Sequence, residues 1–287
     1  NIGRFRVNVF WQRGAVALVV RYIRFEIPDL ATIGLPPVLG DIAMLKRGLV
    51  LVCGPAGSGK STTLASMLSH RNSNAQGHIL TIEDPIEFVH PHRRSLVNQR
   101  EVGMDTLSFH DALRHAMREA PDVIMVGEIR DSQTMQHAMS YADSGHLCMS
   151  TLHANSANQA IQRVINFFPQ DVRHQVLQDL SLNLRAVVGQ RLITNVQGQL
   201  VPALEVMVVT PYIADLIFKG QIDEIKSAMA KGADQGMSTF DNSLYNLYTA
   251  GQITREQAID YADSKTDVAV RIRLLNGIEA PELDTKY

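Results

Sequence analysis

One eight-residue segment of the chain has the residue types and the spacing of a phosphate-binding loop. Glycines let successive backbone N–H groups turn inward around phosphate oxygens, and the start of a helix adds positive charge. Lys60 would bring a charge to the terminal phosphates, and Ser61 would offer a hydroxyl to Mg²⁺. The alternative is a plain glycine-rich turn between a strand and a helix. The segment matches G-x-x-x-x-G-K-[ST] in full, is followed by Thr62, and reads Gly54-Pro55-Ala56-Gly57-Ser58-Gly59-Lys60-Ser61.

Carboxylates follow two other segments that predict buried strands. Glu128 comes after the strand expected at 122–126, and an acidic cluster at 83–87 comes after a strand expected at 78–82. Ligands of open parallel sheets bind beyond the carboxyl ends of the strands, so these acids would lie beside the phosphate-binding loop. A carboxylate there could orient and deprotonate an attacking water. The residues alone do not choose among these acids, and any of them could be a cap or a solvated charge.

Two histidines and two cysteines could also take part in chemistry. His146 and His153 flank an expected strand at 147–152 and would lie at its opposite ends, which makes them poor joint metal ligands. Hydrogen bonding near the phosphates, or packing, is their expected role. Cys53 and Cys148 are the two cysteines of the chain. They are too few for a disulfide framework or a four-cysteine zinc site, which fits a reducing compartment.

Short apolar strands alternate with helical segments through the middle of the chain. This alternation predicts an α/β fold in which helices cover a mainly parallel sheet. Strands are expected at 48–53, 78–82, 122–126, 146–151, 187–193 and 201–209. Helices are expected at 60–70 and 108–119, between 131 and 145, and then at 211–219, 222–231, 238–250, 254–262 and 266–276.

Several residues predict where these helices begin and end. Ser108 and Asp131 have the side chains that cap helix N-termini, and Gly145 is placed to end the helix that Asp131 begins. Thr210 followed by Pro211 predicts a cap with proline at the first helical position. After this point the chain has a helical pattern only.

The N-terminal segment has the alternation of a β-hairpin. Apolar and polar residues alternate over 5–11, and the Val-rich segment 15–25 would pair with them through a turn at 12–14. A lone hairpin is only marginally stable, so we expect its apolar face to pack against something else. A linker rich in Pro and Gly is expected at 26–40. The chain begins at Asn1 without an initiator Met, which predicts that its first domain is incomplete.

The composition limits the classes of function. The 287 residues carry 27 Lys and Arg against 29 Asp and Glu, a formal charge of −2. This near-equal number of positive and negative side chains argues against a dedicated nucleic-acid coat or a polybasic membrane binder. The longest aliphatic stretches, such as 15–20 and 49–53, are far shorter than the roughly 20 residues that a membrane helix needs.

Four motifs, read in order, resemble those of one family, the secretion ATPases that drive type IV pili and type II secretion. They are GPAGSGKST at 54–62 (Walker A), TIEDPIEFVH at 81–90 (aspartate box), APDVIMVGEIRD at 120–131 (Walker B) and GHLCMSTLHANSA at 145–157 (histidine box). The resemblance covers nearly the whole chain and implies a RecA-like P-loop NTPase core.

Within this family the chain is more similar to the pilus retraction motors. It lacks the four-cysteine zinc module that is typical of type II secretion and pilus-extension members. The segment 211–220 departs from the pattern of the main retraction motor, which favours the paralogue of that motor.

The resemblance also implies roles for individual residues. The loop at 54–62 would bind ATP. Glu87 would be the catalytic glutamate that polarises the attacking water, and Glu128 would act near Mg²⁺ and the γ-phosphate, partly through water. His146 and His153 would sense or contact the γ-phosphate region.

Two arginines of the hairpin complete the implied site. Arg6 and Arg21 would lie across from the phosphates and stabilise charge in the transition state, as arginine fingers do. Both fall on polar positions of the hairpin's alternation, so the alternative is that they are solvent-facing strand residues. Arg4 and Arg24 are nearby competitors for the same role.

The resemblance implies a chain of three parts. A remnant of an N-terminal PAS-like domain with its linker would occupy 1–36, a RecA-like ATPase core 37–209, and an all-helical C-terminal domain 210–287. The implied protein is a cytoplasmic homohexamer, peripheral at the inner membrane, that uses ATP and Mg²⁺ to power pilus retraction and twitching motility. Its implied partners are a paralogous retraction ATPase and the platform protein of the pilus machine, and no nucleic acid.

Three other functions stay open at the level of sequence. One is a type II secretion or pilus-extension ATPase. Another is a hexameric nucleic-acid translocase with the same core, which would need a basic pore and is disfavoured by the even charge balance. The third is a weakly hydrolysing regulatory paralogue, which the intact Lys60, Glu87 and Glu128 disfavour.

Overall fold

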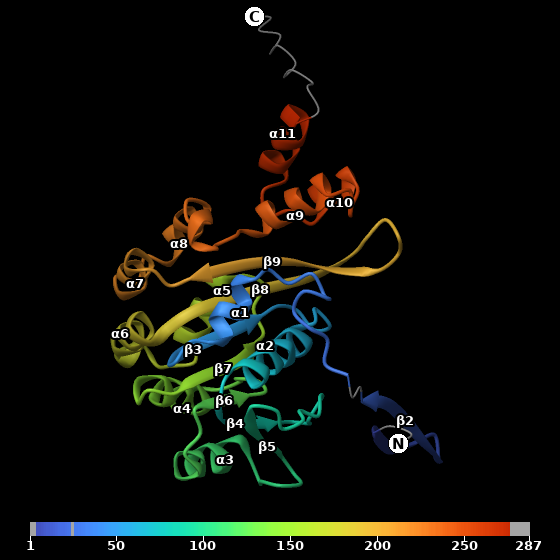
Figure 1. The fold of residues 1–287 in the computed structure, drawn as a ribbon, viewed down its shortest axis with the longest axis vertical. Helices are drawn as coiled ribbons and strands as arrows, with labels where there is room; N and C mark the ends of the chain where they lie inside the picture. Colours follow the sequence, from blue (N-terminus) through green and yellow to red (C-terminus); the bar gives the residue numbers. More distant parts are fainter. Residues whose placement is uncertain (1–3, 24–25, 276–287) are drawn as a thin grey trace, which may run out of the picture.

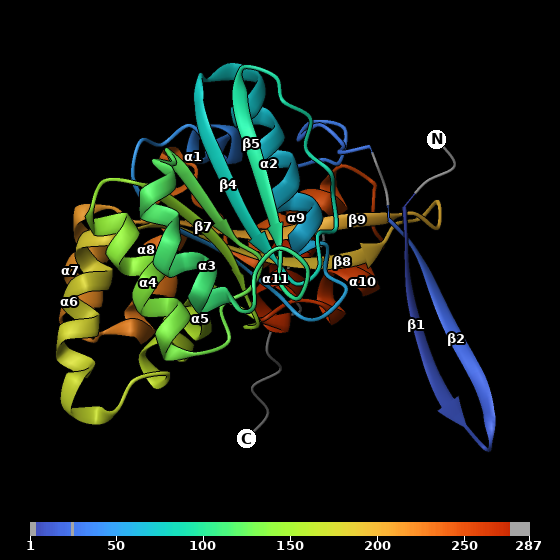
Figure 2. The same cartoon turned by 90° about the horizontal axis from the view of Figure 1, so that it is seen from below.

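The computed structural model describes residues 4–23 and 26–275, which contain one seven-stranded sheet and one two-stranded hairpin (Figures 1 and 2). The larger sheet consists of β3 (Gly48–Cys53), β4 (Gly77–Glu83), β5 (Ser95–Glu101), β6 (Val123–Val126), β7 (Leu147–Leu152), β8 (Leu184–Thr194) and β9 (Leu200–Val208). Its strand order is β5-β4-β6-β7-β3-β8-β9, and every neighbouring pair is parallel except β8 with β9. The predicted α/β fold with a mainly parallel sheet is confirmed.

The central strands are short apolar runs that are buried on both faces. Every residue of β3, β6 and β7 is buried. Because side chains alternate between the two faces of a strand, such runs need a helix layer on each side. All six expected strands are confirmed, with ends that differ by a few residues. The strand β5 is not among the predicted strands, because its residues SLVNQRE are mostly polar and lie at the sheet edge.

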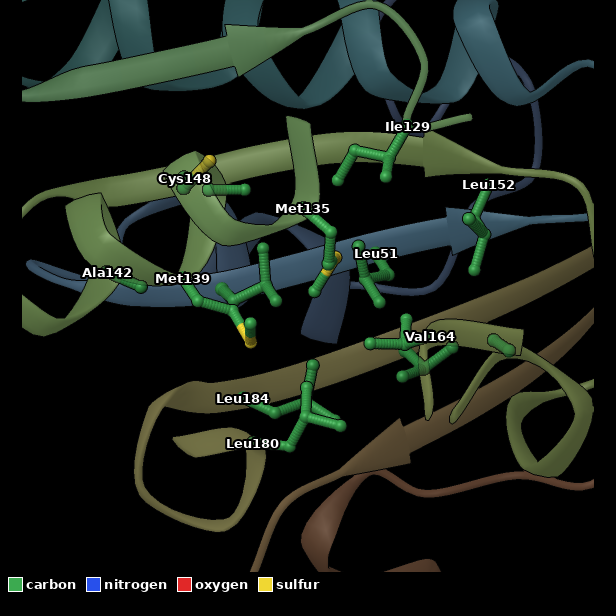
Figure 3. Packing of buried hydrophobic residues seen from close by; sticks show 14 of the residues in the cluster. Leu51, Ile129, Met135, Met139, Ala142, Cys148, Leu152, Val164, Leu180 and Leu184 are labelled. Atoms are coloured by element: carbon green, nitrogen blue, oxygen red, sulfur yellow. The ribbon is translucent and has the colours of Figure 1, made fainter. Parts of the chain in front are cut away.

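Two helix layers cover the larger sheet. On one face, α1 (Val38–Ala43) and α2 (Lys60–Asn74) pack over a core that includes Val50 and Met67. On the other face, Leu51, Met135 and Val164 belong to a second core, which Figure 3 shows from close by. The helices that contribute to this second core are α3 (Phe109–Ala116), α4 (Ser132–Asp143), α5 (Ala157–Asn166), α6 (Arg173–Asn183), α7 (Pro211–Phe218) and α8 (Ile225–Ala230).

Three helices begin at the residues that predict their caps, whereas α1, α5 and α6 have no counterpart among the predicted helices. The side chains of Ser108, Asp131 and Thr210 each accept a hydrogen bond from the backbone N–H three residues further on. Pro211 follows Thr210 at the first turn of α7. Gly145 lies after the end of α4 with a φ of 100°, a conformation that suits glycine. The caps at Ser108 and Asp131 end the loops that leave the carboxyl edge of the sheet after β5 and β6.

The C-terminal part packs against the end of the β8–β9 pair (Figure 1). Phe240 is fully buried there, and the Arg191 guanidinium stacks over its ring at 3.9 Å. The predicted helices of this part are confirmed as α8 (Ile225–Ala230), α9 (Phe240–Thr249), α10 (Arg255–Asp260) and α11 (Lys265–Leu275). Short 3-10 helices lie at Met117–Glu119, Gln170–Val172, Ile222–Glu224 and Ala233–Gln235. Among the described residues, no helix is both long and apolar enough to cross a membrane.

The hairpin pairs β1 (Arg4–Gln12) with β2 (Ala15–Ile23) and stands beside the larger sheet, as Figure 2 shows. Arg6 lies directly opposite Arg21 in its register. No described residue covers the apolar face of the hairpin, which remains between 48% and 75% exposed, so the expected packing of this face stays a prediction. The residues of this face are Phe5, Val7, Val9, Trp11, Val16, Leu18, Val20 and Tyr22.

Candidate active site

The phosphate-binding loop joins β3 to α2 at the carboxyl edge of the larger sheet. Its path requires glycine at two positions. Gly54 has a φ of 158°, and a Cβ there would lie 2.4 Å from the backbone oxygen of Gln190. Gly59 has a φ of 86°, and a Cβ there would lie 2.8 Å from the Gln190 side-chain nitrogen. Side chains at these positions would therefore push the loop away from β8.

Two polar side chains of the loop have surroundings that fit an anionic ligand. The Lys60 ammonium donates hydrogen bonds of 2.9 Å to the carbonyls of Gly54 and Pro55. Burial lowers the pKa of Lys60, and the carboxylate of Glu128 opposes that shift. The buried Ser58 hydroxyl has no hydrogen-bond partner among the described residues. Because an unpaired buried hydroxyl costs free energy, a phosphate oxygen would fit this loop.

The loop faces a cavity of about 270 Å³. Its walls bring together the loop, the two acidic segments and the hairpin, which are far apart in the sequence. The residues that line it include Arg6, Ala56, Gly57, Lys60, Ser61, Glu83, Asp84, Glu87, Phe88, His90, Phe109, Glu128, Arg130 and His153. Thr62 lines a neighbouring hollow instead. The arrangement places both charge-stabilising and proton-accepting groups around one space.

Glu83 and Glu87 differ in their surroundings, although both follow the core of β4. The Glu83 carboxylate is buried and accepts hydrogen bonds from the Thr81 hydroxyl (2.7 Å) and the Gln99 amide (3.1 Å). Its other oxygen accepts the backbone N–H of Glu87 at 3.4 Å. Burial raises the pKa of Glu83, and these hydrogen bonds oppose the shift. Glu83 therefore supports the next loop, whereas the exposed Glu87 presents its side chain to the cavity.

Glu128 forms a charged cluster at the ends of β6 and β7. One of its oxygens accepts hydrogen bonds from the Arg130 guanidinium at 2.7 and 2.8 Å. The other lies 3.0 Å from Nε2 of His153. Ser61 lines the same cavity from the start of α2. A carboxylate and a hydroxyl that line one cavity suit Mg²⁺, which prefers oxygen ligands.

The hairpin directs its polar face toward this site. Arg6 lines the cavity that holds the phosphate-binding loop. Arg21 lines the adjoining hollow, together with Thr62 and Glu87. The structure therefore brings both arginines close to the candidate site, with Arg6 nearer to the loop. Arg24 lies outside the described residues.

Comparison with known proteins agrees with this geometry. Residues 4–243 match the family described as type II/IV secretion system protein. The chain belongs to this family. Its relatives include the type IV pilus ATPase PilU of Pseudomonas aeruginosa, which is 51% identical over 99% of this chain and 75% of its own length. The type IV pilus retraction ATPase PilT of the same organism is 46% identical over 91% of this chain and 76% of its own length.

A solved structure supports the same assignment. A crystal structure of the pilus retraction motor PilT with bound ADP has a TM-score of 0.87 and 44% identity, and covers 93% of this chain and 76% of its own. The expected resemblance of this type II/IV secretion system protein to type IV pilus ATPases is confirmed. Its identity with PilU is higher than its identity with PilT.

The two histidines of the histidine box lie at opposite ends of β7. His153 follows β7 and pairs with Glu128, whereas His146 precedes β7. The His146 carbonyl accepts the N–H of Gly48 at the start of β3, and its ring nitrogen lies 3.1 Å from the Ser144 hydroxyl. A six-residue strand spans roughly 16–20 Å. The structure thus does not bring His146 into the cavity, and its expected contact with the γ-phosphate has no geometric support within the described chain.

Three residues of the site, Arg130, Gln99 and His90, are not among the predicted site residues. Arg130 is two positions after Glu128, so an extended segment would have placed both side chains on one side. That spacing was a usable signal. No sequence signal places Gln99 at the site, because its strand β5 is not among the predicted strands. His90 is buried in the cavity wall, where burial lowers its pKa to about 4 and so keeps it neutral near pH 7.

Proposed function

We propose that this protein hydrolyses ATP to ADP and phosphate and that the reaction powers the retraction of type IV pili in twitching motility. The observation that carries the proposal is that the phosphate-binding loop, Glu87, Glu128 and Arg6 line one cavity. The names of the relatives support the nucleotide and the machine, since they are described as type IV pilus ATPase, retraction ATPase and ADP-bound retraction motor.

The phosphates are held by the loop at 54–62. Its backbone N–H groups and the start of α2 supply positive potential, and the Lys60 ammonium adds a full charge. Ser61 and Glu128 would hold Mg²⁺, in part through water, and the ion would neutralise charge on the phosphates. The described residues contain no cluster of three or more His, Cys, Asp or Glu that could hold a metal alone. This suits Mg²⁺, which commonly binds through one or two protein groups and substrate phosphates.

The acidic segment and the hairpin act on the reacting atoms from other sides. Glu87 orients the attacking water and accepts its proton, because its exposed side chain lines the cavity and the buried Glu83 accepts its backbone N–H. Arg6 in the cavity, and Arg21 in the adjoining hollow, stabilise the negative charge that develops on the phosphoryl group. His153 orients Glu128 through their 3.0 Å contact.

We propose the same three-part division for the working protein: 1–36, 37–209 and 210–287. ATP held between the hairpin-bearing part and the core changes their relative angle. The protein acts as a cytoplasmic homohexamer at the inner membrane, beside the pilus platform protein and a paralogous retraction ATPase. It does not act on nucleic acid, in keeping with its net charge of −2.

Phosphate release by the purified protein with ATP and Mg²⁺, together with its native mass, tests the proposal. We expect steady turnover, a hexameric mass and no response to DNA. Turnover that DNA stimulates in a salt-sensitive way would overturn the proposal in favour of a nucleic-acid translocase. Nucleotide binding with background turnover would instead identify a regulatory paralogue.

The direction of work needs a cellular measurement. Deletion of the gene is expected to reduce twitching and pilus retraction, and the parent gene is expected to restore both. Loss of piliation, or loss of protein secretion with normal twitching, would contradict a retraction role and favour the pilus-extension or type II secretion alternative.

A further inference from the structure

One amide side chain of the edge strand β5 is bonded to three points around the acidic loop. Gln99 Nε2 donates hydrogen bonds to the carbonyl of Phe88 (2.9 Å) and to the carboxylate of Glu83 (3.1 Å). Gln99 Oε1 accepts the backbone N–H of His90 at 2.8 Å. Both amide hydrogens and the amide oxygen are therefore used, which only an Asn or Gln side chain can do.

The position of Gln99 follows from the pairing of β4 with β5. In this parallel register Thr81 lies beside Gln99, and Glu83 lies beside Glu101. Further back along the two strands, Ile79 and Val97 belong to the core under α2. Because side chains alternate, these residues all point to the same face of the sheet. That face is thus apolar within the sheet and becomes polar at the edge where the acidic loop leaves β4.

The loop at 84–90 is consequently tied to the sheet by side chains at several of its backbone groups. Gln99 holds its second half, and Glu83 accepts the N–H of Glu87. Glu101 accepts the N–H of Ile86 at 3.1 Å. These bonds leave the Glu87 side chain exposed at the cavity while its backbone is fixed.

We propose that Gln99 is a positioning residue for ATP hydrolysis, because it fixes the loop at 84–90 so that Glu87 faces the phosphate-binding loop. This inference rests on the proposed ATPase function and adds a residue that does not itself line the cavity. Loss of the amide would leave the Phe88 carbonyl and the N–H of the buried His90 without these partners. Displacement of a catalytic group by about 1 Å is enough to lower a rate on the order of a hundredfold.

The Gln99→Leu variant of the full protein is the first test. We expect kcat for phosphate release to fall by about tenfold to a hundredfold, while the affinity for a non-hydrolysable ATP analogue changes by less than about threefold. Asn98→Leu is the matched control, because Asn98 is exposed on the other face of the same strand. We expect its kcat to stay within about twofold of the parent. A kcat for Gln99→Leu equal to that of the control would overturn the inference.

The Gln99→Glu variant gives a second readout that a merely structural role would not move. The new carboxyl would lie beside the Glu83 carboxyl, and two such neighbours share a proton. When protonated, the new side chain can donate to Phe88 as the amide does. The ratio of parent to variant kcat is therefore expected to shrink as the pH falls from 8 to 6. The other titratable groups around Glu83 include Asp84, Glu87 and His90 in the loop, Glu101 on β5, and Lys60 and Glu128 in the cavity lining.

The outcomes separate this inference from the proposed function. If the parent itself releases no phosphate from ATP, the proposed ATPase function fails. If the parent is active and the Gln99→Glu ratio is constant with pH, the positioning role fails alone. Thermal unfolding and analogue binding show whether Gln99→Leu is folded, and the pH ratio for Gln99→Glu decides the matter if it is not.

Discussion

The larger sheet and the hairpin are both β structure, but they differ in their relation to solvent. Every residue of β3 is buried between two helix layers. In the hairpin, a face of eight apolar side chains is exposed, and Trp11 reaches 75%. The larger sheet thus gains most from the hydrophobic effect, since burial of apolar area is the main source of stability.

This difference divides the candidate site into two kinds of component. The phosphate-binding loop, Glu87 and Glu128 leave the ends of buried strands, and hydrogen bonds fix the segments that carry the two glutamates. Arg6 comes from the exposed hairpin. We therefore expect nucleotide binding to depend on the core and the arginine contribution to depend on where the hairpin is held.

Truncation of one apolar side chain in each region should show the largest contrast. Leu51→Ala in β3 is expected to lower the free energy of unfolding by about 3 kcal/mol, because Leu51 is fully buried and the change leaves a cavity. Val9→Ala in the hairpin is expected to cost less than about 0.5 kcal/mol, because Val9 is 61% exposed. Urea unfolding measures both. Equal losses would mean that the apolar face of the hairpin is covered in solution.

A buried acid gives the core a pH dependence that exposed segments lack. Glu205 on β9 is 2% exposed, and desolvation raises its pKa from 4.5 to about 7. The folded state therefore binds the Glu205 proton more tightly than the unfolded state does. The stability that this proton contributes is fully present below pH 4.5 and is lost as the pH rises through 7. As the pH rises from 5 to 8, the free energy of unfolding of Glu205→Gln should therefore increase by about 2 kcal/mol relative to that of the parent, as measured by urea unfolding.

The matched control for this prediction lies just after the hairpin. Glu26→Gln changes an exposed carboxylate and should track the parent at every pH. A Glu205→Gln curve that also tracks the parent would show that Glu205 is already charged in the folded protein at pH 5. The hydrogen bond that it accepts from the N–H of Ala157 at 2.6 Å acts in that direction.

The smallest expected effect is that of replacing Arg6, which the hairpin contributes to the site. Arg6→Gln should lower kcat by about tenfold with little change in stability, because the hairpin is exposed and the charge acts on the transition state. Arg13→Gln, in the exposed turn of the same hairpin, is the control and should leave kcat unchanged. Phosphate release under saturating ATP measures both. A loss of the same size for both variants would mean that general charge, not the place of Arg6, is what matters.

Local sequence patterns are sufficient for the phosphate-binding side of the site. The apolar run of β3, the glycines after it and Lys60 are contiguous, so one strand, one turn and one helix start could be predicted together. Helix caps such as Ser108 and Thr210 also act within three residues. Such short-range chemistry does not depend on how the strands are ordered.

Contacts between residues of neighbouring strands could not be predicted from the sequence. The pairing of Glu128 with His153 exists because β6 and β7 are neighbours, and the contact of Gln99 with Glu83 exists because β5 joins the sheet beside β4. Strand order is a property of the whole fold. The motif resemblance grouped His146 with the site, yet strand length keeps it at the opposite edge of the sheet.

ATP turnover by Glu87→Gln, beside the parent, is the most direct test of the central claim. The change keeps the size of the side chain and removes its ability to accept a proton. We expect kcat to fall by about a hundredfold or more, with binding of a non-hydrolysable ATP analogue retained. Turnover indistinguishable from the parent would contradict the assignment of Glu87 as the base.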